Sequence, residues 1–552
     1  MPAGPRWRGR LDVAGRSFAV NWSNHDLRRA QLSFAAAWTS EWTLVVALSV
    51  VAFRDGGAAA VGLVTFLRLV PAALVSPVGT SLADRFPRDQ VLRWASVGRA
   101  AALTACALAV GLDAPPILAY SCAALATIAF VVFRPAHSAL LPSLCHAPVE
   151  LTSATVVRGL VDSASTLLGP VLAAVVIAVA NTAAALGCAA ALSLAAGIAL
   201  TGLSYVPSPV TDRLEHHLRR DALDGFRALP RFPSVFLLIR LAWAQMLTRG
   251  CLSVLVVVVA IDVLGVGEAG VGVLTAAIGA GAMVGSLVLS LFVRGGRLAV
   301  MLGAGVALWG LPLVAIGIVS IRVVVVVALA IVGVGNALVD VGIFTLPARL
   351  VPDVVLSRVF GAFESLGALV VAAAALLTPL LLHLVGVHWA LVIVGLIGPA
   401  YAAVSWGRLR SIDGSITRRD LEFDLLDHLE MFHPLPMPAI EQLADRLGTE
   451  VVEAGQPVVT QGDHGDRFYV IERGTARVVQ NGAHRRLLGD GDCFGEIALL
   501  RDIPRTASVV AASTLQLRTL SRDDFLAAVA GPAAARNAAE RVADRWLEGD
   551  AT

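Results

Sequence analysis

Long uncharged apolar runs dominate the chain between about residues 32 and 409. Many of them reach the roughly 20 residues that an α-helix needs to cross the hydrocarbon core of a bilayer. Of the 552 residues, 57% are apolar and only 15% are charged, whereas soluble proteins carry about 25% charged residues. Backbone polar groups find no water inside a bilayer, so the runs must satisfy their own hydrogen bonds. We therefore predict a polytopic α-helical membrane region.

Twelve spans are expected in this region. They lie at about 31–53, 59–80, 91–111, 116–136, 153–180, 183–205, 234–261, 271–293, 298–319, 323–346, 355–382 and 388–407. Arginines cluster before the first span and in the loop at 206–233, and positive residues mark the cytoplasmic side. The pattern predicts a multi-pass protein of the cell inner (plasma) membrane with both termini in the cytoplasm.

The composition divides the chain into six predicted parts. These are a cytoplasmic N-terminal segment (1–30), a first six-span half (31–205), a cytoplasmic middle loop (206–233), a second six-span half (234–409), a linker (410–424) and a cytoplasmic domain (425–548). The two halves echo each other, since 159–163 in span 5 parallels 361–365 in span 11. Paired repeats with a site at their interface are typical of secondary transporters.

Short motifs around spans 2 to 5 indicate a family. Arg68-x-x-Pro71, Pro77-x-Gly79 and residues 83–88, with Arg99 and the Gly169-Pro170 pair, resemble the signature of the major facilitator superfamily, most closely its enterobactin-exporter-like efflux branch. The resemblance implies a secondary-active exporter of a small molecule, with a cytoplasmic gate at Asp84, Arg85 and Arg88. The simpler alternative is a loop that only follows the positive-inside rule. Gly169-Pro170 also resembles the core of an antiporter motif, although alanines follow where that motif has glycines.

Ionisable residues inside spans cost about 2.5–3.5 kcal/mol each on insertion scales, so they are functional candidates. The candidates for transport or proton coupling are Glu41, Arg68, Arg99, Arg158, Asp162, Arg249, Asp340 and Glu364. Arg158 and Asp162 are four residues apart, so they can form a structural pair on one helix face. Glu41 and Glu364 are the best proton-coupling candidates. The alternative is a buried carboxyl group that bonds to Arg68, Arg99 or Arg249.

The tail changes to short alternating apolar runs separated by glycines, which predict strands and tight turns. Two ordered segments, 462–474 and 494–509, resemble the strand-turn-strand pattern and the phosphate-binding cassette of cyclic nucleotide-binding domains. The resemblance implies a β-roll (jelly roll) with flanking helices. A degenerate domain that has lost its ligand is the alternative.

The cassette residues suit a cyclic nucleotide. A helix N-terminus accepts phosphate through free N–H groups, and an arginine fork adds donors to the same oxygens. The resemblance assigns the ribose hydroxyl to Glu496, and the phosphate to Arg505 and the N–H groups of Ile497 and Ala498. The predicted pocket residues are Phe494, Gly495, Glu496, Ile497, Ala498, Arg505, Thr506 and Ala507. Arg541, Arg545 or Trp546 are expected to cap the base from a lid helix.

These observations predict a major facilitator transporter that cytoplasmic cyclic nucleotide regulates, with cAMP preferred over cGMP. A membrane-tethered sensor without transport is the main alternative, and a carrier of cyclic nucleotide is another. We see no nucleophile–base set, metal cluster or Walker loop in the sequence. No enzyme activity, catalytic residue, cofactor, metal or nucleic-acid partner is therefore expected; the expected partners are the bilayer, the nucleotide and a small-molecule substrate.

Overall fold

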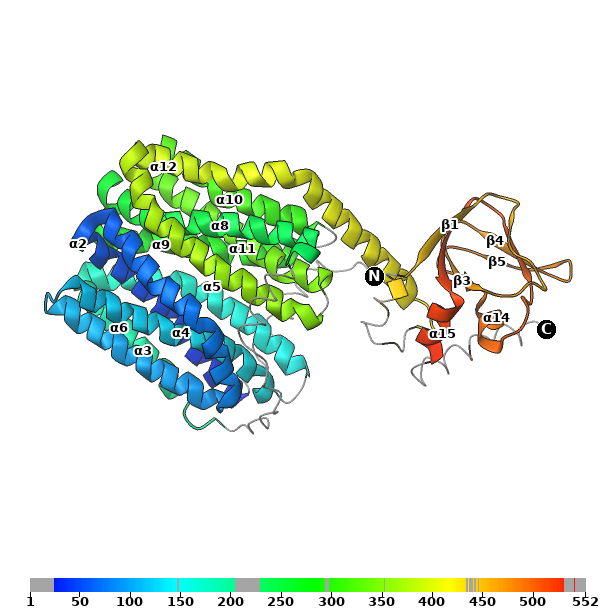
Figure 1. Cartoon of the computed structure of the whole chain (residues 1–552), viewed down its shortest axis with the longest axis horizontal. Coiled ribbons are helices and arrows are strands. Elements are labelled where there is room, and N and C mark those ends of the chain that lie inside the picture. The colour runs from blue at the N-terminus through cyan, green and yellow to red at the C-terminus, as the bar shows by residue number, and fades with distance from the viewer. Residues whose placement is uncertain are drawn as a thin grey trace, which may run out of the picture. The chain divides into compact units, whose positions relative to one another are not determined.

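The computed structural model describes residues 24–145, 148–203, 229–292, 297–351, 353–432 and 446–530, together with residues 435, 440, 443, 444 and 541. The chain separates into two compact units, with the boundary between Arg410 and Ser411. The first unit is helical, and strands form most of the second (Figure 1). Each unit is described by itself.

Helices run antiparallel through the first unit. Their bounds are α2 (His25–Arg85), α3 (Arg88–Gly111), α4 (Pro116–Leu144), α5 (Pro148–Val179), α6 (Thr182–Ala199), α8 (Pro233–Val258), α9 (Gly267–Phe292), α10 (Leu298–Ile318), α11 (Arg322–Leu350) and α12 (Asp353–Asp427). A 3-10 turn, η1 (Leu229–Arg231), precedes α8, and a π-helical turn, η2 (Val259–Val263), follows it.

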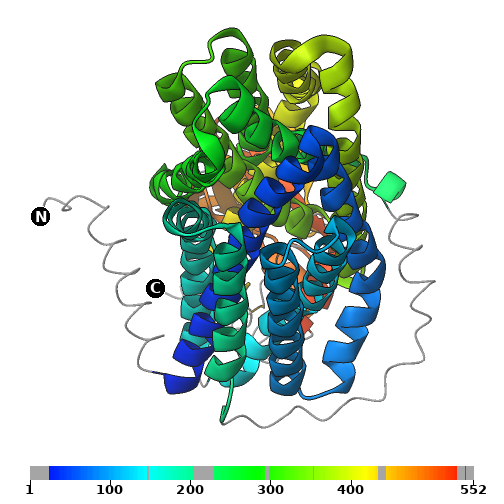
Figure 2. The ribbon, with the colours of Figure 1, turned by 90° about the vertical axis from the view of Figure 1, so that its left-hand side faces the viewer.

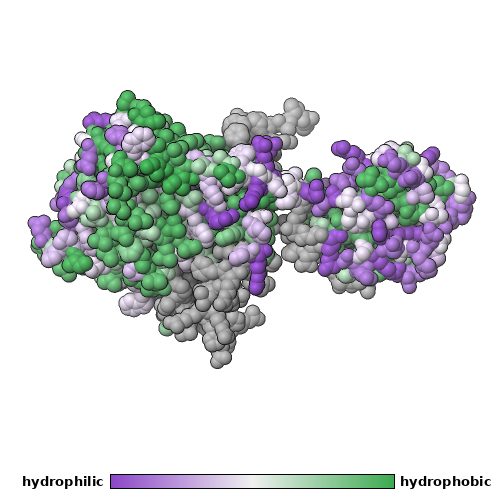
Figure 3. Space-filling view, turned by 45° about the horizontal axis from the view of Figure 1, so that its top comes forward, coloured by the Kyte–Doolittle hydropathy of each residue, from purple (hydrophilic) through white to green (hydrophobic). Residues whose placement is uncertain are grey.

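Among the described residues, ten helices are long and apolar enough to cross a membrane. Two of them are interrupted by glycines with non-helical backbone angles, α2 at Gly56 and Gly57 and α12 at Gly386. Hydrophobic residues cover most of the visible described surface of this unit (Figure 3), as contact with lipid tails requires. The prediction of a polytopic helical membrane region is confirmed at this level.

The helices form two groups, α2 to α6 (blue to cyan) and α8 to α12 (green to yellow), which Figure 2 shows from another side. Helices α5 and α9 pack against each other across the two groups. Gly279 of α9 permits this approach, because a Cβ atom there would lie 2.6 Å from the carbonyl oxygen of Thr166. Small residues let helix backbones approach closely in membranes, where packing supplies much of the association energy.

The second unit contains two antiparallel four-stranded sheets. The strands are β1 (Gly448–Val452), β2 (Pro457–Val459), β3 (Arg467–Arg473), β4 (Ala476–Gln480), β5 (Ala483–Leu488), β6 (Cys493–Phe494), β7 (Ser508–Ala511) and β8 (Leu515–Ser521). Their orders are β1-β8-β3-β6 and β2-β7-β4-β5. Two short helices complete the unit, α14 (Glu496–Arg501) and α15 (Arg522–Ala530). The predicted antiparallel β domain is confirmed, although β5 and β6 were not expected and the run at 507–520 is two strands.

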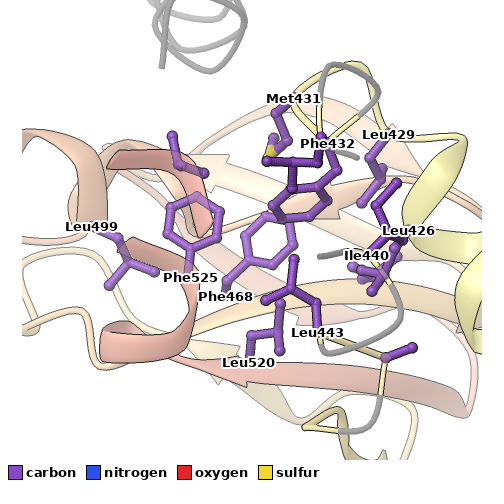
Figure 4. Close-up of a cluster of buried hydrophobic side chains, with 14 residues drawn as sticks. Leu426, Leu429, Met431, Phe432, Ile440, Leu443, Phe468, Leu499, Leu520 and Phe525 are labelled. Atoms are coloured by element: carbon purple, nitrogen blue, oxygen red, sulfur yellow. The ribbon is translucent and has the colours of Figure 1, made fainter. Parts of the chain in front are cut away.

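Strand β3 is buried on both faces and therefore separates two apolar cores. Tyr469 and Ile471 face the core between the sheets. Phe468 and Val470 face the other core, where Phe468 stacks on Phe525 of α15 at a centroid distance of 4.7 Å (Figure 4). This second core also contains Leu426 of α12, Phe432, and Leu499 of α14. It joins three helices to the sheet, and we call it the helix-side core.

Candidate functional site

Helix α14 begins at the glycine predicted to open the phosphate-binding turn. Gly495 occupies the N-cap position with φ of 95°, in the left-handed region that glycine adopts without a steric penalty. A Cβ atom there would also lie 2.6 Å from Nη1 of Arg505. No side chain caps the helix at this position. The backbone thus presents the first N–H groups of α14, including those of Ile497 and Ala498, beside an arginine.

Arg505 lies in the loop before β7 and is only 5% exposed. Its Nη1 atom donates to the carbonyl oxygen of Gly495 at 3.0 Å, and its Nη2 atom donates to that of Arg467 at 2.7 Å. The guanidinium carbon lies 5.8 Å from the ring centroid of Tyr469, which stacks on Phe494 at 4.9 Å. These contacts fix the guanidinium group at the N-terminus of α14. Burial lowers the pKa of Arg505, so an anion beside it would recover electrostatic energy.

Glu496 is the first residue of α14, and only 3% of it is exposed. Its Oε2 atom is buried and accepts no hydrogen bond from any residue that the structure describes. Burial raises the pKa of Glu496, against the opposing effects of its own backbone N–H and of the charges on Arg486 and Arg505. A buried acceptor without a donor costs about 1–3 kcal/mol. A ligand hydroxyl group is one donor that would satisfy this oxygen.

The remaining pocket predictions fall around this centre. Thr506 and Ala507 follow Arg505 and are half-buried before β7 begins. Arg541 is exposed, whereas Arg545 and Trp546 lie outside the described residues, so the lid assignment stays a prediction. Sequence reasoning missed Arg486, whose charge acts on Glu496, because the polar strand β5 was not expected.

In the membrane unit, the structure brings Glu41 together with two of the predicted arginines. Its Oε1 atom accepts from Nη2 of Arg68 at 2.6 Å, and its Oε2 atom accepts from Nη2 of Arg99 at 2.7 Å. Arg99 also donates to Oγ of Ser193 at 3.1 Å and lies 4.2 Å from the ring centroid of Phe130. Helices α2, α3 and α6 are therefore joined by buried polar contacts. This arrangement is the buried-carboxyl alternative for Glu41.

Glu364 has a different environment. It is exposed on α12, and no described residue bonds to its carboxylate group. Arg249 is exposed on α8, with its guanidinium carbon 5.8 Å from the ring centroid of Trp42. Asp340 accepts from Asn336 at 2.7 Å. The structure thus does not bring Glu364 and Glu41 into one cluster.

The structure describes only parts of the predicted Arg158–Asp162 pair and of the predicted cytoplasmic gate. Arg158 donates to Oγ of Ser138 at 2.7 Å, and its pairing with Asp162 stays a prediction. The side chains of Asp84 and Arg85 lie outside the described set, and α3 begins at Arg88. The cytoplasmic gate also stays a prediction.

Comparison with known protein families identifies the two units. Residues 32–293 match the model of the Major Facilitator Superfamily, and residues 449–531 match the model of the cyclic nucleotide-binding domain. The chain thus contains one segment similar to a transporter family and one segment similar to a cyclic nucleotide-binding domain, a domain related to protein kinase A regulatory subunits.

Two curated relatives each match about a fifth or less of this chain. A cAMP-dependent protein kinase regulatory subunit from Yarrowia lipolytica is 40% identical over 116 residues, which are 21% of this chain and 31% of the relative. The corresponding protein from Mucor circinelloides is 47% identical over 88 residues, 15% of this chain and 21% of the relative. The chain thus spans less than a third of the length of these relatives. Among solved structures, the regulatory domain of Toxoplasma gondii protein kinase A with cAMP is 26% identical, with a TM-score of 0.22 over 25% of this chain and 56% of that chain.

The buried carboxyl group of Glu496 predicts a pH dependence of stability. Burial raises its pKa above 4.5 in the folded domain. The contribution of the protonated carboxyl group to the free energy of unfolding is therefore fully present below about pH 4.5, and it is lost as the pH rises through the folded-state pKa. Without nucleotide, Glu496→Gln should therefore stabilise the domain at pH 7.5, and this advantage should shrink as the pH falls to 4.5. Urea midpoints measured by pulse proteolysis check this, and parallel pH profiles for the two proteins would contradict it.

The two ion pairs of Glu41 predict that its replacement destabilises the membrane unit more than replacement of Glu364 does. Glu41→Gln leaves two buried guanidinium groups without their counterion, and breaking a buried pair costs about 3–5 kcal/mol. The matched control is Glu364→Gln, which changes an exposed carboxylate group. Thermal unfolding of purified protein in detergent should show a large loss for the first variant and little for the second. Equal losses would rule out the structural role of Glu41.

Proposed function

We propose that this protein is a secondary-active transporter of a small molecule whose activity is set by a cyclic nucleotide bound at the N-terminus of α14. The observation that carries the proposal is that Glu496 and the guanidinium group of Arg505 both lie at the N-terminus of α14, where one carboxylate oxygen of Glu496 has no donor among the described residues. A 3′,5′-cyclic nucleotide presents a ribose hydroxyl group to the carboxylate and a phosphate to the arginine and the helix N–H groups. The likeness to cAMP-dependent kinase subunits supports this ligand class.

For the membrane unit, we propose twelve spans with α2 and α12 each contributing two, divided at their glycine breaks. The motif resemblance supports export as the direction, and the arginine-rich loops support a cytoplasmic location for both termini and for the nucleotide domain. In the cytoplasm the domain would be exposed to the cyclic nucleotide, which is made there. Glu364 is the better proposed proton carrier, because protonation of Glu41 would break one of its two ion pairs.

Regulation requires a physical connection between the pocket and α12. Leu499 of α14 and Leu426 of α12 belong to the same helix-side core, so a shift of α14 repacks the neighbours of α12. Arg518 of β8 adds a polar link, with Nη1 2.9 Å from Oε1 of Glu422 in α12 and Nε 2.8 Å from Oε2 of Glu472. A ligand that favours one arrangement of α14 therefore biases the position of α12.

Arg505 provides the direct test of nucleotide binding. Removing a charge-assisted hydrogen bond costs about 1.5–3 kcal/mol, so Arg505→Ala should weaken cyclic nucleotide binding by about ten- to a hundredfold. Arg505→Lys keeps the charge but loses the planar fork, and it should give an intermediate loss. Calorimetry on purified full-length protein measures both. Unchanged affinity in a folded Arg505→Ala protein, or no binding by the folded wild type, would refute the proposed site.

The ion pair between Arg518 and Glu422 should be an energetic link and not only a surface contact, because both side chains are mostly buried. Residues in one salt-bridge network show interaction energies of about 0.5–3 kcal/mol in double-mutant cycles. For Arg518→Ala combined with Glu422→Ala we expect an interaction energy of about 1 kcal/mol. It is measured by urea unfolding of the domain in the full-length protein. The control pair, Arg467 and Glu450, is more exposed and 3.4 Å apart. Additive effects for Arg518 and Glu422 would exclude them as a link.

A further inference from the structure

Helix α8 is surrounded by protein along most of its length. It contacts α2, α10 and α11, and it packs on α12 at Gly250, where a Cβ atom would lie 2.4 Å from the carbonyl oxygen of Val371. Between residues 241 and 258, every residue of α8 is buried or half-buried except Arg249, which is exposed. Because other helices enclose α8 at this level, the exposed guanidinium group faces the interior of the membrane unit and not lipid.

The partner of Arg249 comes from the other helix group. The guanidinium carbon of Arg249 lies 5.8 Å from the ring centroid of Trp42 in α2. None of the carboxylates that the structure describes forms an ion pair with Arg249, and Glu41, the neighbour of Trp42, is already bound by Arg68 and Arg99. A charged side chain within a membrane span is costly and marks a functional site by default. Arg249 thus has an aromatic partner but no described counterion.

The surroundings of Trp42 contain more donors and positive charge than acceptors and negative charge. Glu41 supplies one negative charge to two guanidinium groups, so this cluster is positive before Arg249 is counted. Nε1 of Trp42, Nε of Arg68 and Nη1 of Arg99 are buried and donate to no residue within the described part of the chain. A bound anion would supply negative charge and acceptors, whereas a bound cation would increase the imbalance.

We propose that Arg249 and Trp42 form a substrate site for an organic anion with an aromatic or apolar body. This proposal rests on the proposed transport function and adds the chemical class of the substrate. The planar fork of an arginine matches carboxylate and phosphate oxygens, and an indole ring offers a large apolar face to the rest of the molecule. Because α2 and α8 belong to different helix groups, one bound anion contacts both groups at once.

The test compares three naphthalene probes that differ in charge. They are 1-naphthoate, 1-naphthylmethylammonium and the neutral 1-naphthalenemethanol. Equilibrium dialysis measures their binding to full-length protein in lipid nanodiscs, and uptake by empty nanodiscs is subtracted. We expect the wild type to bind 1-naphthoate with a Kd of about 1 mM or lower, and to bind the other two probes about tenfold or more weakly.

Variants of α8 assign this preference to one side chain. Arg249→Gln removes the charge and should lower the affinity for 1-naphthoate about tenfold or more, whereas Arg249→Lys keeps the charge without the fork and should lose less. The matched control is Arg240→Gln. Arg240 is also exposed on α8, but its guanidinium carbon lies 4.7 Å from the ring centroid of Phe236 in the same helix. This control should leave the binding of all three probes unchanged.

Three results would overturn the anion site. They are equal binding of the three probes, unchanged 1-naphthoate affinity in folded Arg249→Gln, and no binding of 1-naphthoate by folded wild type up to about 10 mM. The proposed transport function would not fall with them, because a neutral or cationic substrate is compatible with it. Cyclic nucleotide binding by the same preparation is measured separately by calorimetry, so the two proposals fail independently.

Discussion

The proposed ligand site depends on the burial of the Glu496 carboxyl group. The side chain is almost fully buried at the start of α14. One of its carboxylate oxygens accepts no hydrogen bond from a described residue. Arg505, nine residues further along the chain, already donates to the carbonyl groups of Gly495 and Arg467 and is held in place by them. These contacts hold the guanidinium group at the start of α14, and the missing donor of Glu496 is a cost that a ligand can remove. Functional sites often retain such a cost at the expense of stability.

The buried carboxylate of Glu41 in the membrane unit has the opposite environment. Both oxygens of Glu41 are bonded to guanidinium groups, and Arg99 is bonded in turn to Ser193. This arrangement ties α6 to α2 and α3, from which α6 is distant in the sequence. This network joins helices to one another, whereas Glu364 is exposed on α12. The two glutamates thus have different environments.

Much of the architecture follows from local sequence. A membrane region of long apolar helices could be predicted because apolar runs of about 20 residues are a strong signal, and α14 could be predicted because its first turn follows a glycine. Strand β5 could not, since its sequence, Ala483 to Leu488, is mostly polar and exposed and buries only Leu488 fully. The partners of Glu41 were named as alternatives, but only tertiary packing selects Arg68 and Arg99. Arg486 was missed for a related reason, because its role depends on the pairing of β5 with β4.

Regulation by a cyclic nucleotide requires that ligand binding at α14 changes the C-terminal part of α12. Hydrogen–deuterium exchange on full-length protein, with and without saturating cyclic nucleotide, can detect such a change. We expect slower exchange in α14 together with changed exchange at residues 415–432, which contain the C-terminal part of α12 and its contacts with the helix-side core. Protection confined to α14, with identical exchange at 415–432, would show a binding module that does not communicate with the transporter domain.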